Sequence, residues 1–255
     1  MNKYIILLLV SICFICGCKK KTTEPCEVLV NGVYQFPTLP QDHSNMTREE
    51  IDEFFNLPAD ICSCITTKGL IETCLNFPYI GLIIAGSNPQ SGYDLLVKPY
   101  FRGIPELETR ADRGTFLLQK FLTIDPLGYD TTWQPLELGR FLFKLDYIKI
   151  FMGQYVNLEV LTHDEKIALM EKAIVVYEKE RSDTKHHGIF ELECTTSLMG
   201  RLMFQNGYSA MVDAYNSDEQ FGELLAFIQG QHISIYTVEF VYNLSKEYLN
   251  YLKNN

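Results

Sequence analysis

Residues 134–152 read QPLELGRFLFKLDYIKIFM, and this stretch decides the fold that the sequence predicts. Its apolar residues recur at intervals of three and four, which is the spacing of one face of an α-helix. A helix that is apolar over so much of its circumference is covered by neighbours on more than one side. We therefore expect residues 134–152 to form the central helix, with an apolar face made by Leu138, Phe141, Leu142, Phe143, Leu145, Ile148, Ile150, Phe151 and Met152.

A second long helix is predicted over residues 162–181. Thr162 and Glu165 have the spacing of a capping box, in which each side chain accepts a hydrogen bond from a backbone N–H at the start of the helix. The opposite face of this helix carries glutamates and lysines, which indicates a position at the periphery. On this placement, Val176→Ala should cost less stability than Phe141→Ala in the central helix.

Shorter helices are predicted along the rest of the chain. A capping box at Thr47 and Glu50 starts the first, and residues 79–85 fit either a buried helix or a strand. The total of about ten short-to-medium helices with short turns predicts an all-α fold of antiparallel or right-angled pairs. This rhythm is also compatible with a degenerate helical solenoid. Helical patterns or capping signals cover residues 47–57, 58–65, 66–77, 89–101, 104–110, 112–124, 134–152, 162–181, 189–205, 209–215, 217–228 and 234–253.

Residues 25–45 precede the helices and look irregular. Asn31-Gly32 stands between β-branched residues, which is typical of a tight hairpin turn. An extended arm lying over the helical body fits the segment equally well. The predicted organisation is therefore a tether and short extended arm over residues 18–45, followed by a single all-helical domain over residues 46–255.

The first eighteen residues have the pattern of a secretion signal. Lys3 is followed by an apolar run over residues 4–16, which is too short to span a bilayer, and Lys19-Lys20-Lys21 interrupts any longer buried helix. Ile15-Cys16-Gly17-Cys18 resembles the lipobox of bacterial lipoproteins. That resemblance implies a signal peptide over residues 1–17 that is cleaved before Cys18, and acylation of Cys18 by palmitate-type chains.

The resemblance also implies an address. The acylated Cys18 would hold the chain on a membrane of the cell envelope, since more than one acyl chain gives stable anchoring. Lys19 stands where an Asp retains many lipoproteins in the inner membrane, which favours the outer membrane.

The charge balance argues against nucleic acid as a partner. The chain has a formal net charge of −10, and nucleic-acid binding depends on neutralising phosphates. Beyond the signal stand five cysteines, an odd number that leaves at least one thiol unpaired within the chain. The spacing of Cys62 and Cys64 is too short for a zinc site, so we interpret these two and Cys74 as small buried apolar residues.

The mature part resembles uncharacterised α-helical lipoproteins of the Bacteroides type. The stretches that carry the resemblance are LPADI at 57–61, GLIETCLNFP at 69–78 and MGR at 199–201. The group brings no activity and no catalytic residue with it, so the resemblance implies the fold and the anchor alone.

Local motifs for chemistry are absent. The sequence has no Gly-x-Ser-x-Gly, His-Glu-x-x-His, dinucleotide-binding or EF-hand pattern, and it predicts no catalytic residue, metal site or cofactor. His187, Glu191 and Cys194 would share one face of a helix and could hold a metal there. A turn that leads into a helix explains the same residues better.

Tyr129, Asp130 and Trp133 are the candidate ligand-binding residues, because aromatic rings beside an acid can stack on a sugar. A hydrophobic lid over the start of the central helix is the simpler explanation. Asp130-Thr131-Thr132 also resembles an O-glycosylation motif of that bacterial group.

Two functions remain from the sequence. The first is a membrane-anchored envelope lipoprotein that binds a protein or glycan without catalysis. The second is an envelope hydrolase with a site assembled from distant residues. A buried acid pair or His–Asp pair in a deep cleft would favour the hydrolase, and the absence of local motifs favours the binding protein.

Overall fold

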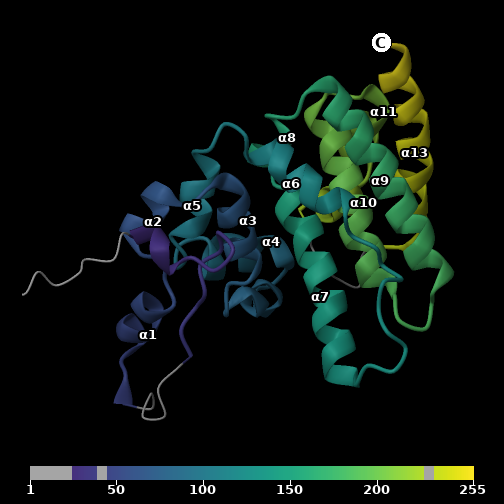
Figure 1. Ribbon diagram of the computed structural model, residues 1–255. Coiled ribbons are helices and arrows are strands. Elements are labelled where there is room, and N and C mark those ends of the chain that lie inside the picture. Colours follow the sequence, from purple (N-terminus) through teal and green to yellow (C-terminus); the bar gives the residue numbers. More distant parts are fainter. Residues whose placement is uncertain (1–24, 39–44, 227–232) are drawn as a thin grey trace, which may run out of the picture.

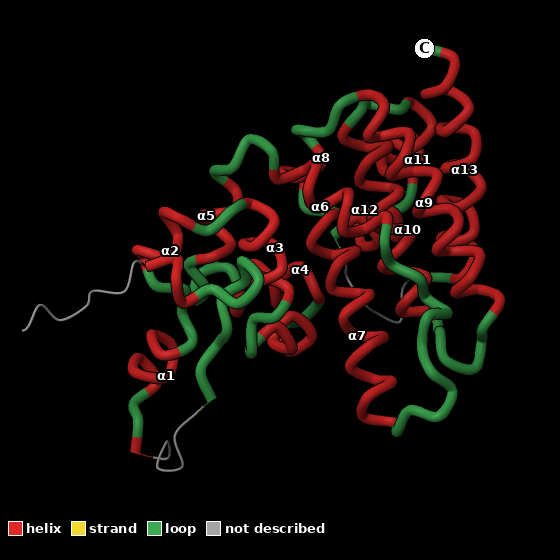
Figure 2. Tube along the Cα trace, viewed as in Figure 1, coloured by secondary structure: helices red, strands yellow, loops and turns green. Residues whose placement is uncertain are grey.

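The computed structural model describes residues 25–38, 45–226 and 233–255. These residues form thirteen α-helices and no β-strand, which confirms the all-α prediction. Figure 2 shows helices and loops alone along the described trace. No helix in these three ranges combines the length and apolar character needed to cross a membrane. The predicted signal peptide, Cys18 and the tether up to residue 24 lie outside the described residues.

Short helices make up the first half of the chain and gather on one side of the molecule (Figure 1). Their core contains a stacked pair of rings, Phe77 and Phe101, with centroids 4.3 Å apart. The undecided stretch of residues 79–85 is a 3₁₀-helix. The elements are η1 (Pro25–Val28), α1 (Arg48–Phe54), α2 (Ala59–Cys64), α3 (Thr67–Leu75), η3 (Ile80–Ala85), α4 (Pro89–Gly92), the π-helix η4 (Tyr93–Val97) and α5 (Gly103–Glu108).

Longer helices form the other side, where α9, α10 and α13 lie side by side (Figure 1). Helix α6 (Arg113–Leu122) contacts α3, α7 and α9 and so joins the two groups. The elements of this side are α7 (Pro135–Met152), α8 (Tyr155–Leu158), α9 (His163–Ser182), α10 (Ile189–Gln205), α11 (Ser209–Ser217), α12 (Glu219–Leu225) and α13 (Ile235–Asn254).

The central helix is α10, so the prediction that residues 134–152 form the centre is wrong. Every residue of α10 from Leu192 to Met203 is buried, and α7, α8, α9, α11, α12 and α13 all contact it. Small residues permit this close packing, because a Cβ at Gly200 would lie 2.7 Å from Leu225 Cδ2. In α7 the buried residues start only at Leu145, and Leu136 is 65% exposed.

Helix α9 is also misplaced by the sequence. Val176 is fully buried, because α9 packs against α6, α10 and α13, whereas Glu171 and Glu178 on its polar face are exposed as expected. Phe141 is only partly buried, because the first half of α7 extends past its neighbours. The placement of the two helices on which the expected order of stability losses at Val176 and Phe141 rested is therefore wrong, and the order itself stays a prediction.

Both predicted capping boxes are confirmed. Glu50 N–H donates to Thr47 Oγ1 at 3.2 Å, and Thr47 N–H donates to Glu50 Oε2 at 2.7 Å. Thr162 and Glu165 make the same pair of bonds at the start of α9, at 3.3 and 2.9 Å. These residues satisfy N–H groups that the first turn of a helix cannot pair.

Residues 25–38 lie against α2 and α3. Val30 and Val33 form an antiparallel bridge around Asn31 and Gly32, whose φ angles of 53° and 78° suit a tight hairpin turn. A disulfide joins Cys26 to Cys64 at the end of α2. The interpretation of Cys64 as a buried apolar residue is thus wrong, whereas Cys62 and Cys74 are buried thiols.

Candidate functional site

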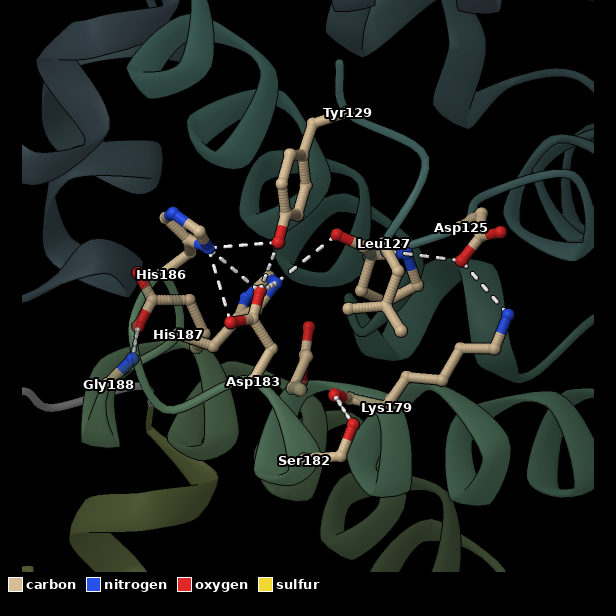
Figure 3. A network of polar contacts seen from close by, with 12 residues as sticks. Asp125, Leu127, Tyr129, Lys179, Ser182, Asp183, His186, His187 and Gly188 are labelled. Atoms are coloured by element: carbon tan, nitrogen blue, oxygen red, sulfur yellow. Dashed lines mark hydrogen bonds and ion pairs between the residues drawn. The ribbon is translucent and has the colours of Figure 1, made fainter. Parts of the chain in front are cut away.

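The predicted ligand residues lie in the loop between α6 and α7. Tyr129 Oη donates to Asp183 Oδ2 at 2.6 Å and lies 2.9 Å from His186 Nδ1 (Figure 3). The hydrogen bond to Asp183 raises the pKa of Tyr129. Tyr129 therefore ties this loop to the turn between α9 and α10.

Trp133 and Tyr129 both pack edgewise on Phe141, with ring centroids 5.5 and 6.3 Å from it. Asp130 accepts hydrogen bonds from the N–H and the hydroxyl of Thr132, at 2.8 and 2.7 Å. The structure thus gathers the two aromatic rings over α7 and turns the carboxylate into its own loop. Trp133 keeps 38% of its surface exposed, and the glycan contact at these residues stays a prediction.

His187, Glu191 and Cys194 serve the start of α10. Glu191 Oε2 accepts a hydrogen bond from Gly188 N–H at 2.7 Å, and His187 Nε2 lies 3.2 Å from Pro126 O. Burial raises the pKa of the Cys194 thiol well above its usual range, which keeps it protonated and a weak nucleophile. Within residues 25–38, 45–226 and 233–255, no three His, Cys, Asp or Glu side chains group so that they could hold a metal ion.

A buried ionic cluster links α7, α9 and α10. Lys149 Nζ lies 2.7 Å from Asp146 Oδ1 and 2.5 Å from Glu180 Oε1. Thr195 donates to the second oxygen of Glu180 at 2.7 Å. Sequence reasoning missed this cluster, although Asp146 and Lys149 were visible as two charges in the apolar half of residues 134–152.

The cluster has the properties of a structural element. Burial raises the pKa of Asp146 to about 6 against the opposing effect of Lys149, and it raises the pKa of Glu180 in the same way. Burial alone would lower the pKa of Lys149, but the two carboxylates outweigh it and raise that pKa. Lys149 and Glu180 have no exposed side-chain surface, so a substrate has no direct path to them.

Three hollows open around the junction of α3, α6 and α7, and we name them the junction hollows. Their volumes are about 330 Å³ between α3 and α6, about 300 Å³ between α6 and α7, and about 200 Å³ between α3 and α7. Lys120 and Thr123 line both the first and the second, and Lys144 lines both the second and the third. The three hollows are therefore neighbours that share their walls.

Helical spacing explains how these walls form. Phe141, Lys144, Leu145 and Ile148 follow one face of α7 and line the α6–α7 hollow. The adjacent face of α7 also contains Lys144 and lines the α3–α7 hollow, with Arg140, Phe143 and Tyr147. On α6, the residues Phe116, Gln119, Lys120 and Thr123 repeat the same spacing.

Two lysines stand where the hollows meet. Lys120 Nζ pairs with Glu72 Oε1 at 2.6 Å, and Lys144 Nζ donates to Asn76 Oδ1 at 3.1 Å. The pKa of Lys144 is lowered, first by loss of water around its ammonium group and then by the positive charge of Lys120. Lys144 is thus a cation whose hydrogen-bond partner here is a neutral amide.

The lining determines what the junction hollows can do chemically. Their walls combine aromatic and aliphatic side chains with lysine and arginine, and they contain no His, Cys or Ser. A Ser or Cys nucleophile activated by a histidine is therefore not formed within these walls. The arrangement is suited to holding a ligand by apolar contact and charge.

The sequence contains a signal for this site that motif searches do not detect. Each wall is one helical face on which a lysine replaces an apolar residue at an interval of three or four. That pattern is common on exposed helices. It indicates a binding site only when three such faces meet in the folded chain. Compared with models of protein families, with curated proteins and with solved structures, the chain matches none of them.

Proposed function

We propose that the protein is a lipid-anchored lipoprotein of the cell envelope whose helical part binds a ligand in the junction hollows without catalysis. The observation that carries the binding function is the meeting of three hollows at Lys120 and Lys144. Concave sites with mainly apolar walls and a few placed polar groups are the usual form of ligand sites. The ligand is a protein segment, a glycan or a smaller molecule that presents a matching group.

The anchor rests on the sequence around Cys18 and has one structural support. The disulfide between Cys26 and Cys64 suits an oxidising compartment, because disulfides persist outside the cytoplasm and are rare within it. An envelope address, with the outer membrane favoured by Lys19, accords with that chemistry.

The hydrolase alternative is not favoured by the positions of the candidate groups. A buried acid pair, Asp146 and Glu180, and a His–Asp pair, His186 and Asp183, are both present. Lys149 donates hydrogen bonds to both carboxylates of the first pair, and Tyr129 donates to Asp183 of the second. None of these residues lines a junction hollow.

Photoaffinity labelling of the full chain in membranes tests the binding site. The probe is benzophenone, a neutral aromatic ketone that inserts into nearby C–H bonds when irradiated, and peptide mass spectrometry locates the label. We expect labelling of the residues that line the junction hollows. Thr123→Trp should suppress it, because Thr123 is exposed and lines two of the hollows.

Thr109→Trp is the matched control for this experiment. Thr109 and Thr123 both follow the last turn of a helix, are exposed, and donate from Oγ1 to a backbone carbonyl at 2.7 Å. Thr109→Trp should leave the labelling unchanged. Equal labelling of the hollows in both variants would refute the binding site.

The anchor is tested separately. Cells that express the wild-type chain or Cys18→Ser are fed an alkyne-tagged palmitate, and membranes are separated from soluble protein. We expect tagged wild-type protein in the membrane fraction and untagged Cys18→Ser. Equal tagging of the two chains would refute acylation at Cys18.

A further inference from the structure

We infer that the ligand of the junction hollows is an organic carboxylate, with its anionic group on Lys120 and Lys144 and its apolar body in the α6–α7 hollow. This inference rests on the proposed function and adds the chemical class of the ligand. It is argued from charge, from hydrogen bonding and from the shape of the lining.

The charge of the lining is opposite to that of the whole chain. Four basic side chains line the hollows against two acidic ones, in a chain of net charge −10. Both acids already have lysine partners, since Glu72 pairs with Lys120 at 2.6 Å and Asp125 with Lys179 at 3.0 Å. The basic side chains are Lys68, Lys120, Arg140 and Lys144.

Lys144 supplies the specific contact. Its ammonium group can donate three hydrogen bonds, and in the described part of the chain it donates one, to Asn76. Among the same residues it forms no ion pair. A carboxylate that enters the α6–α7 hollow completes these hydrogen bonds, and charge-assisted bonds of this kind are about twice as strong as neutral ones. A cationic ligand meets two lysines instead and is repelled.

The apolar body of the ligand has a matching wall. Ile124, Leu145 and Ile148 line the α6–α7 hollow together with the ring of Phe141. The volume of about 300 Å³ is at the lower end of the range typical of small-molecule sites. One aromatic ring system or a short aliphatic chain suits this space, with the carboxylate at the lysine side.

A pair of photoaffinity probes that differ only in charge tests this inference on the full chain in membranes. The probes are 4-benzoylbenzoate and its uncharged amide, 4-benzoylbenzamide. We expect the acid to label the hollows at a roughly five- to tenfold lower concentration than the amide, because only the acid carries a negative charge that pairs with the lysines. Lys144→Gln should abolish this advantage.

Lys185→Gln is the control, since Lys185 is exposed and lines none of the hollows. It should leave the advantage of the acid intact. If the amide labels the hollows as well as the acid, or if Lys144→Gln keeps the advantage, the ligand is not an anion while the binding site stands. If neither probe gives labelling that Thr123→Trp suppresses, both the inference and the proposed function are overturned.

Discussion

The carboxylate of Glu180 on α9 accepts a hydrogen bond from Lys149 of α7 at 2.5 Å, and neither side chain has any exposed surface. This contact lies beside the central helix α10, where Thr195 donates to the other oxygen of Glu180. These bonds fix the positions of α7, α9 and α10 relative to one another, although the three helices are separate in the sequence. The buried charges are tolerated because each has a partner.

Lys149→Met should destabilise the fold strongly. The substitution leaves Asp146 and Glu180 buried without a cation, and breaking a buried pair in this way costs roughly 3–5 kcal/mol. Lys179→Met is the control, because Lys179 and Asp125 form a pair whose side chains are 39% and 49% exposed. Exposed pairs contribute under about 1 kcal/mol. Equal denaturation midpoints for the two variants would contradict the structural role of the cluster.

The stability of the chain should depend on pH through Asp146. Burial raises the pKa of this carboxyl from 3.8 to about 6, so the folded state binds its proton more tightly than the unfolded state does. The resulting stabilisation is complete below pH 3.8 and is lost as the pH rises through about 6. It amounts to at most about 3 kcal/mol.

Asp146→Asn removes this contribution. The difference in unfolding free energy between wild type and Asp146→Asn should therefore fall between pH 4 and pH 7, by up to about 3 kcal/mol. Asp130→Asn should change the slope in the opposite direction, because hydrogen bonds from Thr132 lower the pKa of Asp130. Parallel curves for wild type and Asp146→Asn would show that Asp146 is not a buried acid.

Two helical glycines should respond oppositely to alanine. A Cβ at Gly69 on α3 would lie 2.0 Å from the carbonyl oxygen of Gly32, whereas a Cβ at Gly139 on α7 meets nothing within 4 Å. Gly69→Ala should cost about 1–3 kcal/mol through overpacking. Gly139→Ala should add about 0.5–1 kcal/mol, because alanine favours the helix. Stabilisation by both substitutions would mean that residues 25–38 do not pack on α3.

The disulfide predicts a definite pattern of thiol reactivity. Cys26 and Cys64 are bonded to each other, and Cys62, Cys74 and Cys194 are buried free thiols. In denaturant without reductant, an alkylating reagent should modify only Cys62, Cys74 and Cys194 among the cysteines after residue 18. With reductant it should modify Cys26 and Cys64 as well. Peptide mapping then assigns the pair. Alkylation of Cys26 before reduction would contradict the bond.

Much of the secondary structure followed from local signals. Thr47 and Thr162 start helices because each has a glutamate three positions later, and such interactions need no knowledge of the rest of the fold. The identity of the central helix did not follow in this way. The buried face of α10 includes two threonines and a serine, which are polar residues and so conceal its central position in the sequence. Their burial is tolerated because each hydroxyl can bond to the backbone: Thr196 Oγ1, for example, donates to the carbonyl of Leu192 at 2.8 Å.

The candidate binding site could not be predicted from the sequence, because it too depends on how distant helices pack. Nothing in the sequence distinguishes Lys120 and Lys144 from the other lysines, and their importance comes from the meeting of three helical faces. The aromatic loop was visible, because Tyr129 and Trp133 stand close together in the chain. Its link to Asp183 depends on a turn 54 residues later, which no local pattern indicates.

Lysine footprinting on the full chain tests the junction hollows most directly. An acetylating reagent modifies unprotonated amines, so the lowered pKa of Lys144 should make it one of the faster-reacting lysines. We expect saturating 4-benzoylbenzoate to slow the acetylation of Lys144 severalfold, while exposed Lys185 reacts at an unchanged rate. An equal rate at Lys144 with and without the acid would contradict the claim that these hollows hold an anionic ligand.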